Sequence, residues 1–165
     1  MVIYIKRGKH YASNRKIKLL NFNKRFFGNF KMDESCWYQT EIFGNHLNKL
    51  TGFSTDIWGK DVVRFAWRPA KQQNRFEIYV YLHIGGVWVR GNNLSDDLID
   101  IVGTDIVSFN IDLNENSVLF TLGSKMLQKQ YPVSRGRGWL YWFYFGGKAK
   151  SPWEMKMGLV WGLSL

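Results

Sequence analysis

The sequence is poor in cysteine and proline, and it has no long apolar run. Its single cysteine, Cys36, excludes an intramolecular disulfide, and no neighbouring base would activate it, so we interpret it as a buried thiol. No stretch approaches the ~18 apolar residues of a membrane span, and the N-terminus lacks the apolar segment of a signal peptide. We therefore expect a soluble protein, made in a cytoplasm, without membrane insertion.

Motifs for metal binding, phosphate binding and glycoside hydrolysis are also missing. His10, His46 and His83 lie far apart and have no cysteine partners, which argues against a zinc site. The aspartates within residues 96–100 lack the spacing of a calcium loop, and the Gly-Gly pairs indicate turns, because no helix pattern follows them. No strand pattern carries the pair of carboxylates that glycoside hydrolysis needs. We expect no metal, no cofactor and no catalytic residue.

Aromatic and β-branched residues are abundant, and they alternate with polar ones. The hydrophobic fraction is 45%, the aromatic fraction is 17%, and sixteen glycines punctuate the apolar runs. Period-two alternation covers residues 62–68 and ends at Pro69, and it returns over residues 76–84. Gly85-Gly86 then predicts a β-hairpin, because glycine supplies the positive φ of type I′ and II′ turns. A second hairpin is predicted from residues 105–113 and 118–122.

Further strand patterns complete an all-β chain. They cover Val2–Lys6, Ile17–Asn23, Phe26–Met32, Trp139–Phe145 and Trp153–Leu165, whereas residues 39–48 fit a short helix or an irregular loop. About nine or ten short strands favour an antiparallel β-sandwich of the jelly-roll type with little or no helix. We expect one domain over residues 1–165 with a basic N-terminal segment of about residues 1–32, of which residues 7–16 form a loop.

The charge is unevenly distributed along the chain. Residues 1–32 hold nine Lys or Arg and no acid, whereas residues 91–124 hold six acids and no Lys or Arg. Such polarity would orient docking onto an acidic neighbour. The basic segment could also bind nucleic acid, but its phenylalanines alternate like buried strand residues, so we do not favour this. The candidate docking residues are Lys6, Arg7, Lys9, Arg15, Lys16 and Lys18.

Polar and aromatic side chains of the middle strands form a candidate glycan-binding face. If the strands of residues 62–68 and 76–84 are neighbours, then Arg64 and Arg68 share one open face with the aromatic residues of the second strand. A lyase would need a Tyr or His base beside an Arg that neutralises a uronate, and this is the best catalytic constellation available. We favour a non-catalytic polar face. The candidate residues are Arg64, Arg68, Tyr79, Tyr81, His83 and Trp88.

Exposed aromatic residues are a second signal for binding. Five of them lie in or beside predicted loops and turns, where Trp and Tyr are over-represented in binding hot spots. We expect two or three of the eight tryptophans to be exposed. The five are Trp37, Tyr38, Trp58, Trp88 and Trp153.

Two stretches of sequence resemble known families. The run Tyr144-Phe145-Gly146-Gly147, followed by Ser151-Pro152, resembles a segment near the C-terminus of many concanavalin-A-like jelly-roll proteins. That likeness implies a sandwich whose concave face often binds glycans. The wider layout is similar to small structural proteins of tailed bacteriophages of Bacteroides-type bacteria, and it implies a virion part. The segments that carry it are residues 33–38, 47–53 and 64–68.

From these observations we predict a non-enzymatic bacteriophage virion protein. Its jelly roll would sit on a capsid or tail and bind other virion proteins, and possible partners include a further copy of itself and a cell-surface glycan. The first alternative is a lectin-like module that uses the concave face. A polysaccharide lyase and a nucleic-acid binder are further alternatives. The predicted location is the virion.

Overall fold

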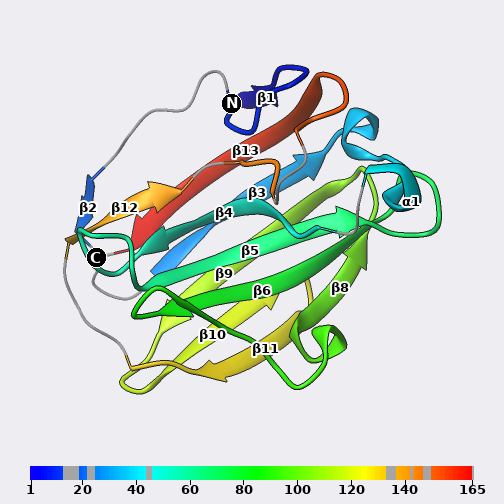
Figure 1. The fold of residues 1–165 in the computed structure, drawn as a ribbon. Helices are drawn as coiled ribbons and strands as arrows, with labels where there is room; N and C mark the ends of the chain where they lie inside the picture. The colour runs from blue at the N-terminus through cyan, green and yellow to red at the C-terminus, as the bar shows by residue number, and fades with distance from the viewer. Residues whose placement is uncertain are drawn as a thin grey trace.

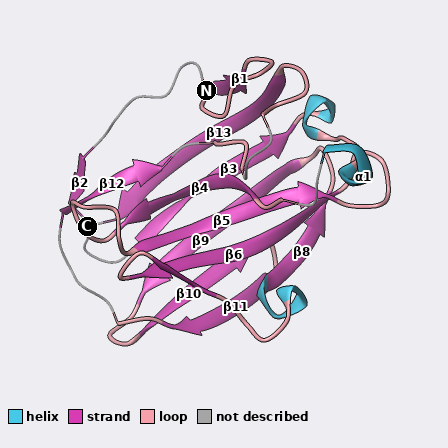
Figure 2. Cartoon of the chain, viewed as in Figure 1, coloured by secondary structure: helices cyan, strands magenta, loops and turns pink. Residues whose placement is uncertain are grey.

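The chain folds into two antiparallel sheets that pack face to face. The computed structural model describes residues 1–12, 19–21, 25–43, 46–132, 137–141, 143–146 and 150–164. One sheet has six strands in the order β1-β13-β3-β9-β10-β11, and the other has seven, in the order β2-β12-β4-β5-β6-β7 with β8 beside β6. Figures 1 and 2 show the two layers, with only short helical turns at the margin. The predicted all-β sandwich is confirmed.

The strands are β1 (Val2–Ile5), β2 (Leu19–Asn21), β3 (Arg25–Met32), β4 (Asn48–Ser54), β5 (Val62–Pro69), β6 (Phe76–Ile84), β7 (Val87–Val89), β8 (Leu98–Val102), β9 (Ile106–Leu113), β10 (Ser117–Leu122), β11 (Lys125–Gln130), β12 (Arg137–Tyr141) and β13 (Met155–Ser164). The helical turns are η1 (Glu34–Cys36), α1 (Thr40–Phe43) and η2 (Leu94–Asp97).

Aromatic rings from both sheets meet in the core. Phe65 of β5 lies 5.2 Å from Phe120 of β10, measured between ring centroids, and Phe26 of β3 lies 5.7 Å from Phe53 of β4. Such edge-on pairs add to the stabilisation that burial provides. Alternation along β5 and β6 therefore places every second side chain in this core and directs the others outward, away from the six-stranded sheet.

Both predicted hairpins are confirmed. Gly85 and Gly86 adopt φ values of +60° and +84°, as a type I′ turn requires, and β6 pairs with β7 across them. Strands β9 and β10 pair antiparallel. Pro69 is the last residue of β5, as expected.

The strand predicted over residues 139–145 is shorter than expected. β12 ends at Tyr141, and Trp142 lies outside the described residues. Phe143 and Phe145 are buried, while the backbone of Tyr144 pairs with that of Lys49, which belongs to β4. The segment thus extends the seven-stranded sheet without being one continuous strand.

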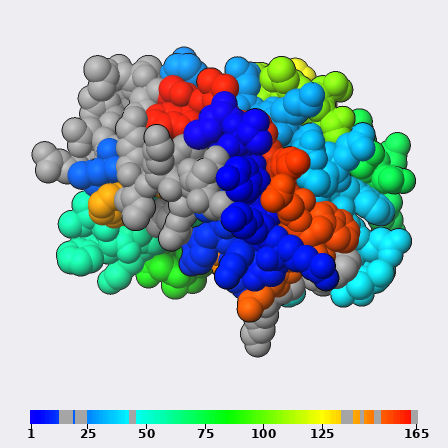
Figure 3. Space-filling model, turned by 90° about the horizontal axis from the view of Figure 1, so that it is seen from above, coloured from blue at the N-terminus to red at the C-terminus, as the bar shows by residue number. Residues whose placement is uncertain are grey.

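The N-terminal segment is built into the sandwich. β1 is an edge strand paired with β13, and the amide of Gly8 donates to the carbonyl of Ser151. Figure 3 shows this segment, in blue, against the last part of the chain. Lys6, Arg7 and Lys9 are exposed, whereas the candidate docking residues Arg15, Lys16 and Lys18 lie outside the described residues. No helix in the described part of the chain is long and apolar enough to span a membrane.

Candidate functional site

Strands β5 and β6 bring most of the predicted site residues to one face. Their register pairs Arg64 with Tyr81 and Arg68 with Glu77. Strand β7 adds Trp88, which pairs with His83 of β6. All these side chains point away from the core between the sheets, because their neighbours along each strand point into it.

Five side chains form a compact group, called here the central cluster: Lys49, Arg64, Tyr81, His83 and Trp88. The Nζ atom of Lys49 lies 3.5 Å from the centroid of the Tyr81 ring, and the guanidinium carbon of Arg64 lies 5.0 Å from it. The Tyr81 hydroxyl and His83 Nε2 are hydrogen-bonded at 2.9 Å. Trp88 stacks on Tyr81 with ring centroids 5.2 Å apart. Tyr81 is therefore the hub that the other four side chains contact.

Burial and like charge shift the ionisation of this cluster. Burial, helped by the nearby Arg64 guanidinium, lowers the pKa of Lys49 to about 7. Burial, Arg64 and Lys49 together lower the pKa of His83 below its usual value of 6.5, which favours the neutral imidazole. Burial raises the pKa of Tyr81, which keeps its hydroxyl protonated. The site thus holds a permanent cation, a neutral imidazole and an amine that titrates near neutrality.

An aromatic group borders the cluster on the β4 side. Phe143 and Phe145 face the core, so Tyr144 between them points to the opposite face of the sheet. Tyr144 is paired with Lys49, and the two side chains lie on the same face. His10 stacks on Tyr144 with ring centroids 5.6 Å apart, and the exposed Tyr11 meets it edge-on at 4.9 Å. Burial, and then the neighbouring Tyr11, raise the pKa of Tyr144.

The middle of this face is covered, contrary to the open face that the sequence predicted. Tyr79 is 2% exposed and Tyr81 is 8% exposed. Together with Ala66 they form a second, small apolar cluster, against which pack Leu47, Trp88, Leu94 and Leu98. Tyr79 is thus a packing residue, and Tyr81 presents little more than its hydroxyl end. The accessible positions are Arg64, Arg68, His83 and Trp88, each of them half-buried.

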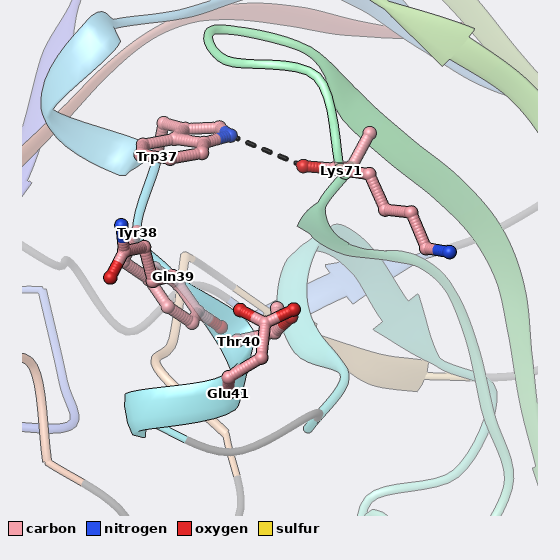
Figure 4. A pocket seen from close by; sticks show the side chains of 7 residues that line it. Trp37, Tyr38, Gln39, Thr40, Glu41 and Lys71 are labelled. Carbon is pink, nitrogen blue, oxygen red and sulfur yellow. Dashed lines mark hydrogen bonds between the residues drawn. The ribbon is translucent and has the colours of Figure 1, made fainter.

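Beyond this cover, the face continues into a pocket near α1. Glu77 pairs with Arg68 and accepts a hydrogen bond from the Tyr79 hydroxyl. A cavity of about 190 Å³ borders this pair. It shares Thr40, Glu41 and Lys71 with a larger cavity of about 400 Å³ beside Trp37 (Figure 4). We call the two together the end pocket.

Three side chains of this candidate site are not among the residues that the sequence predicted for it. They are Lys49, Glu77 and Tyr144. The alternation of residues 62–68 and 76–84 could have identified Glu77, since it shares the outward face with Tyr79. The position of Tyr144 depends on pairing with a strand distant in sequence.

The prediction that five aromatic residues in or beside loops are exposed is only partly correct. Trp58 is 79% exposed and Trp153 is 38% exposed, whereas Trp37 and Trp88 are half-buried. Tyr38 was predicted to be exposed, but it is 1% exposed, because it packs in the core beside Trp67 and accepts a hydrogen bond from Asn48.

Comparison with known proteins establishes the fold. No protein-family model and no curated protein matches the sequence. The chain is similar to the crystal structure of a native glycosidic hydrolase, with 10% identity and a TM-score of 0.54 over 99% of this chain and 79% of the other. It is similar to a functionally unknown protein from Saccharomyces cerevisiae, with 6% identity and a TM-score of 0.56 over 99% and 88%. Alginate lyase AlyC3 in complex with dimannuronate matches at 9% identity and a TM-score of 0.54 over 98% and 73%.

These likenesses correct two predictions. The resemblance to concanavalin-like jelly rolls is supported, but the prediction of a non-enzymatic protein is contradicted, because structures of a hydrolase and a lyase share this fold. Nothing in them indicates a bacteriophage, so the virion role has no support. At these identities the likeness establishes the fold alone.

Proposed function

We propose that this protein cleaves an acidic polysaccharide by β-elimination at the central cluster. The observation that carries the proposal is the composition of that cluster. Arg64, a permanent cation, and Lys49, whose pKa is about 7, lie beside His83, and none of the five side chains of the cluster is a carboxylate. A glycosidase needs two carboxylates across the scissile bond, whereas elimination from a uronate needs a cation for the substrate carboxylate and a base.

The reaction places definite demands on the site. The C5–H bond of the uronate breaks and its proton passes to a base, a C4–C5 double bond forms, and the C4–O4 bond breaks. The leaving oxygen takes up a proton. A cation beside the carboxylate lowers the barrier, because negative charge develops there as the C5 proton leaves.

Each demand has a candidate among the described residues. Arg64 would pair with the substrate carboxylate, since its fork of N–H donors matches the two oxygens. His83 would accept the C5 proton at Nδ1, in the tautomer whose Nε2–H donates to the Tyr81 hydroxyl and so orients the ring. Lys49, whose pKa is about 7, would be protonated often enough to supply the proton to O4.

A solved structure with a similar fold gives further support to this proposal. Alginate lyase AlyC3, which was solved with dimannuronate, shares the sandwich over nearly the whole of this chain. Dimannuronate is a uronate disaccharide, so the fold accommodates a substrate of this class in another protein. For this chain the same class of substrate follows from the cations of the central cluster.

The proposal is tested by incubating the protein with polymannuronate and polygalacturonate and following ultraviolet absorbance, which the new C4–C5 double bond produces. We expect absorbance to increase with at least one polymer. Arg64→Ala should reduce the rate about a hundred-fold or more, as the loss of a charge-stabilising group does in other enzymes. The rate should also fall as the medium is acidified through the lowered pKa of His83.

The control is Arg25→Ala. Arg25 is also an arginine on a strand, but it lies on the six-stranded sheet and is paired with Asp112 in an exposed position. This variant should keep the full rate. Binding of the polymers without any new absorbance would contradict the lyase proposal, and so would an Arg64→Ala variant as active as the wild type.

A further inference from the structure

The end pocket lies on the same side of the seven-stranded sheet as the central cluster. Its inner wall is the Arg68–Glu77 pair of β5 and β6. Arg68 lies four residues beyond Arg64 along β5, a separation of roughly 13 Å at the usual rise of a strand. The small apolar cluster of Tyr79 separates the two, with Leu47 and Leu94 packed over it. A ligand that occupies both places must therefore be an extended chain that crosses this ridge.

The pocket is large enough for a ligand, and it is lined by the side chains that recognise sugars. Its larger part, about 400 Å³, lies within the range of small-molecule sites. Trp37 forms one side, and its indole is held in place because Nε1 donates to the carbonyls of Ala70 and Gln72, each at 3.2 Å. Figure 4 shows the Glu41 carboxylate across the space from this ring. A fixed aromatic surface opposite polar groups suits a ring with hydroxyls on its edge.

The charges of the pocket indicate how such a ring would be oriented. Gln39, Thr40 and Glu41 can accept hydrogen bonds from hydroxyl groups, whereas the exposed side chain of Lys71 borders the pocket and carries its amine outward, away from Trp37 (Figure 4). A sugar carboxylate would be repelled by Glu41 and attracted by Lys71. The pocket thus suits one uronate that directs its carboxylate toward Lys71 and its hydroxyls toward Glu41.

We propose that the end pocket is a distal subsite that binds a uronate of the same polysaccharide, several sugars away from the bond that is cleaved. The inference rests on the proposed function for the class of the ligand. It predicts that the affinity of the protein increases with the length of the oligosaccharide, and that this increase depends on residues far from the central cluster.

The test measures the dissociation constants of mannuronate oligosaccharides by calorimetry, for a disaccharide and for a long oligomer, with His83→Ala present in every protein so that the oligomer is not cleaved. Lys71→Gln and Thr40→Val both change side chains at the rim of the pocket, and neither residue contributes to the core. Each should weaken binding of the long oligomer about five-fold, the value of one or two hydrogen bonds, and leave the disaccharide unaffected. Lys125→Gln, an exposed lysine of β11 in the other sheet, is the matched control.

The outcomes separate this inference from the proposed function. If the long oligomer binds but is not cleaved by the protein with His83 intact, the lyase proposal fails, and the two variants still decide whether the pocket is a subsite. If Lys71→Gln and Thr40→Val bind the long oligomer as His83→Ala alone does, the distal subsite is ruled out. An equal loss of affinity for the disaccharide would also overturn it, because the pocket would then belong to the central site.

Discussion

The outward faces of the two sheets differ in what covers them. On β3 of the six-stranded sheet, buried residues alternate with exposed ones, and Arg25 and Lys31 extend into solvent. No residue of β5 in the seven-stranded sheet is exposed, and Ala66, which points outward, is 0% exposed. The difference arises because side chains from other segments, Leu47 and Leu94 among them, pack over the outward face of β5 and β6.

Burial changes how a charged side chain affects stability and pKa values. The ion pair of Arg25 with Asp112 lies in solvent, where such pairs contribute little to stability. Lys49 and Arg64 are half-buried beside Tyr81, where each disfavours the charge of the other and the pKa of Lys49 is lowered to about 7. A half-buried lysine beside a half-buried arginine is unfavourable for folding, and strongly shifted ionisable groups often gather at functional sites.

The largest loss of stability is expected from a substitution at Gly52 of β4, which is paired with Arg64 of β5. Gly52 has φ of +154°, and a Cβ atom there would lie 2.2 Å from Arg64 Cβ and 2.3 Å from the Val63 carbonyl oxygen. Gly52→Ala should therefore lower the free energy of unfolding by about 4 kcal/mol or more, measured by urea denaturation. It should also displace Arg64.

Gly158→Ala is the counterpart in the six-stranded sheet. A Cβ atom at Gly158 would have its nearest neighbour, Lys31 Cβ, at 3.5 Å, which is an ordinary contact. This variant should remain close to wild-type stability. Similar losses in both variants would contradict the contacts at these two positions. The comparison concerns these positions and not the sheets as a whole, because a Cβ atom at Gly28 of β3 would lie 2.0 Å from the Val160 carbonyl oxygen.

The sequence predicted the strands better than the site, and particular residues show why. Alternation over residues 106–113 and 117–122 is a local property, and β9 and β10 follow from it. Lys49 reaches Tyr81 because β4 has an irregularity in register between Lys49 and Gly52, and nothing in the local pattern indicates it. The cover over Tyr79 comes from distant segments, so no strand pattern could predict that the face is closed.

A smaller effect is expected from Lys49→Met, and its size should depend on pH. The folded protein holds the pKa of Lys49 near 7, below the usual 10.5, so between these values the unfolded chain binds the proton and the folded chain does not. The stability of the wild type should therefore rise with pH across this window, relative to the variant. At pH 6 the variant should be more stable by on the order of 2 kcal/mol, and the difference should shrink toward pH 10.

Thermal denaturation at several pH values measures this difference. Lys31→Met, on the exposed side of β3, is the matched control for loss of an amine. A difference between wild type and Lys49→Met that stays constant from pH 6 to pH 10 would contradict the buried position of this amine.

The smallest change in stability is expected from substitutions on the exposed outward face of the six-stranded sheet. Ile106 is 72% exposed on β9 and Val160 is 61% exposed on β13, so neither loses much apolar contact on replacement. The double variant Ile106→Thr, Val160→Thr should unfold within about 0.5 kcal/mol of the wild type and cleave at the same rate. A larger loss, together with a change of mass in solution, would mean that this face is covered in an assembly. The contrast between the sheets would then hold only for the isolated chain, and the cover of the central cluster would no longer mark it out as the functional face.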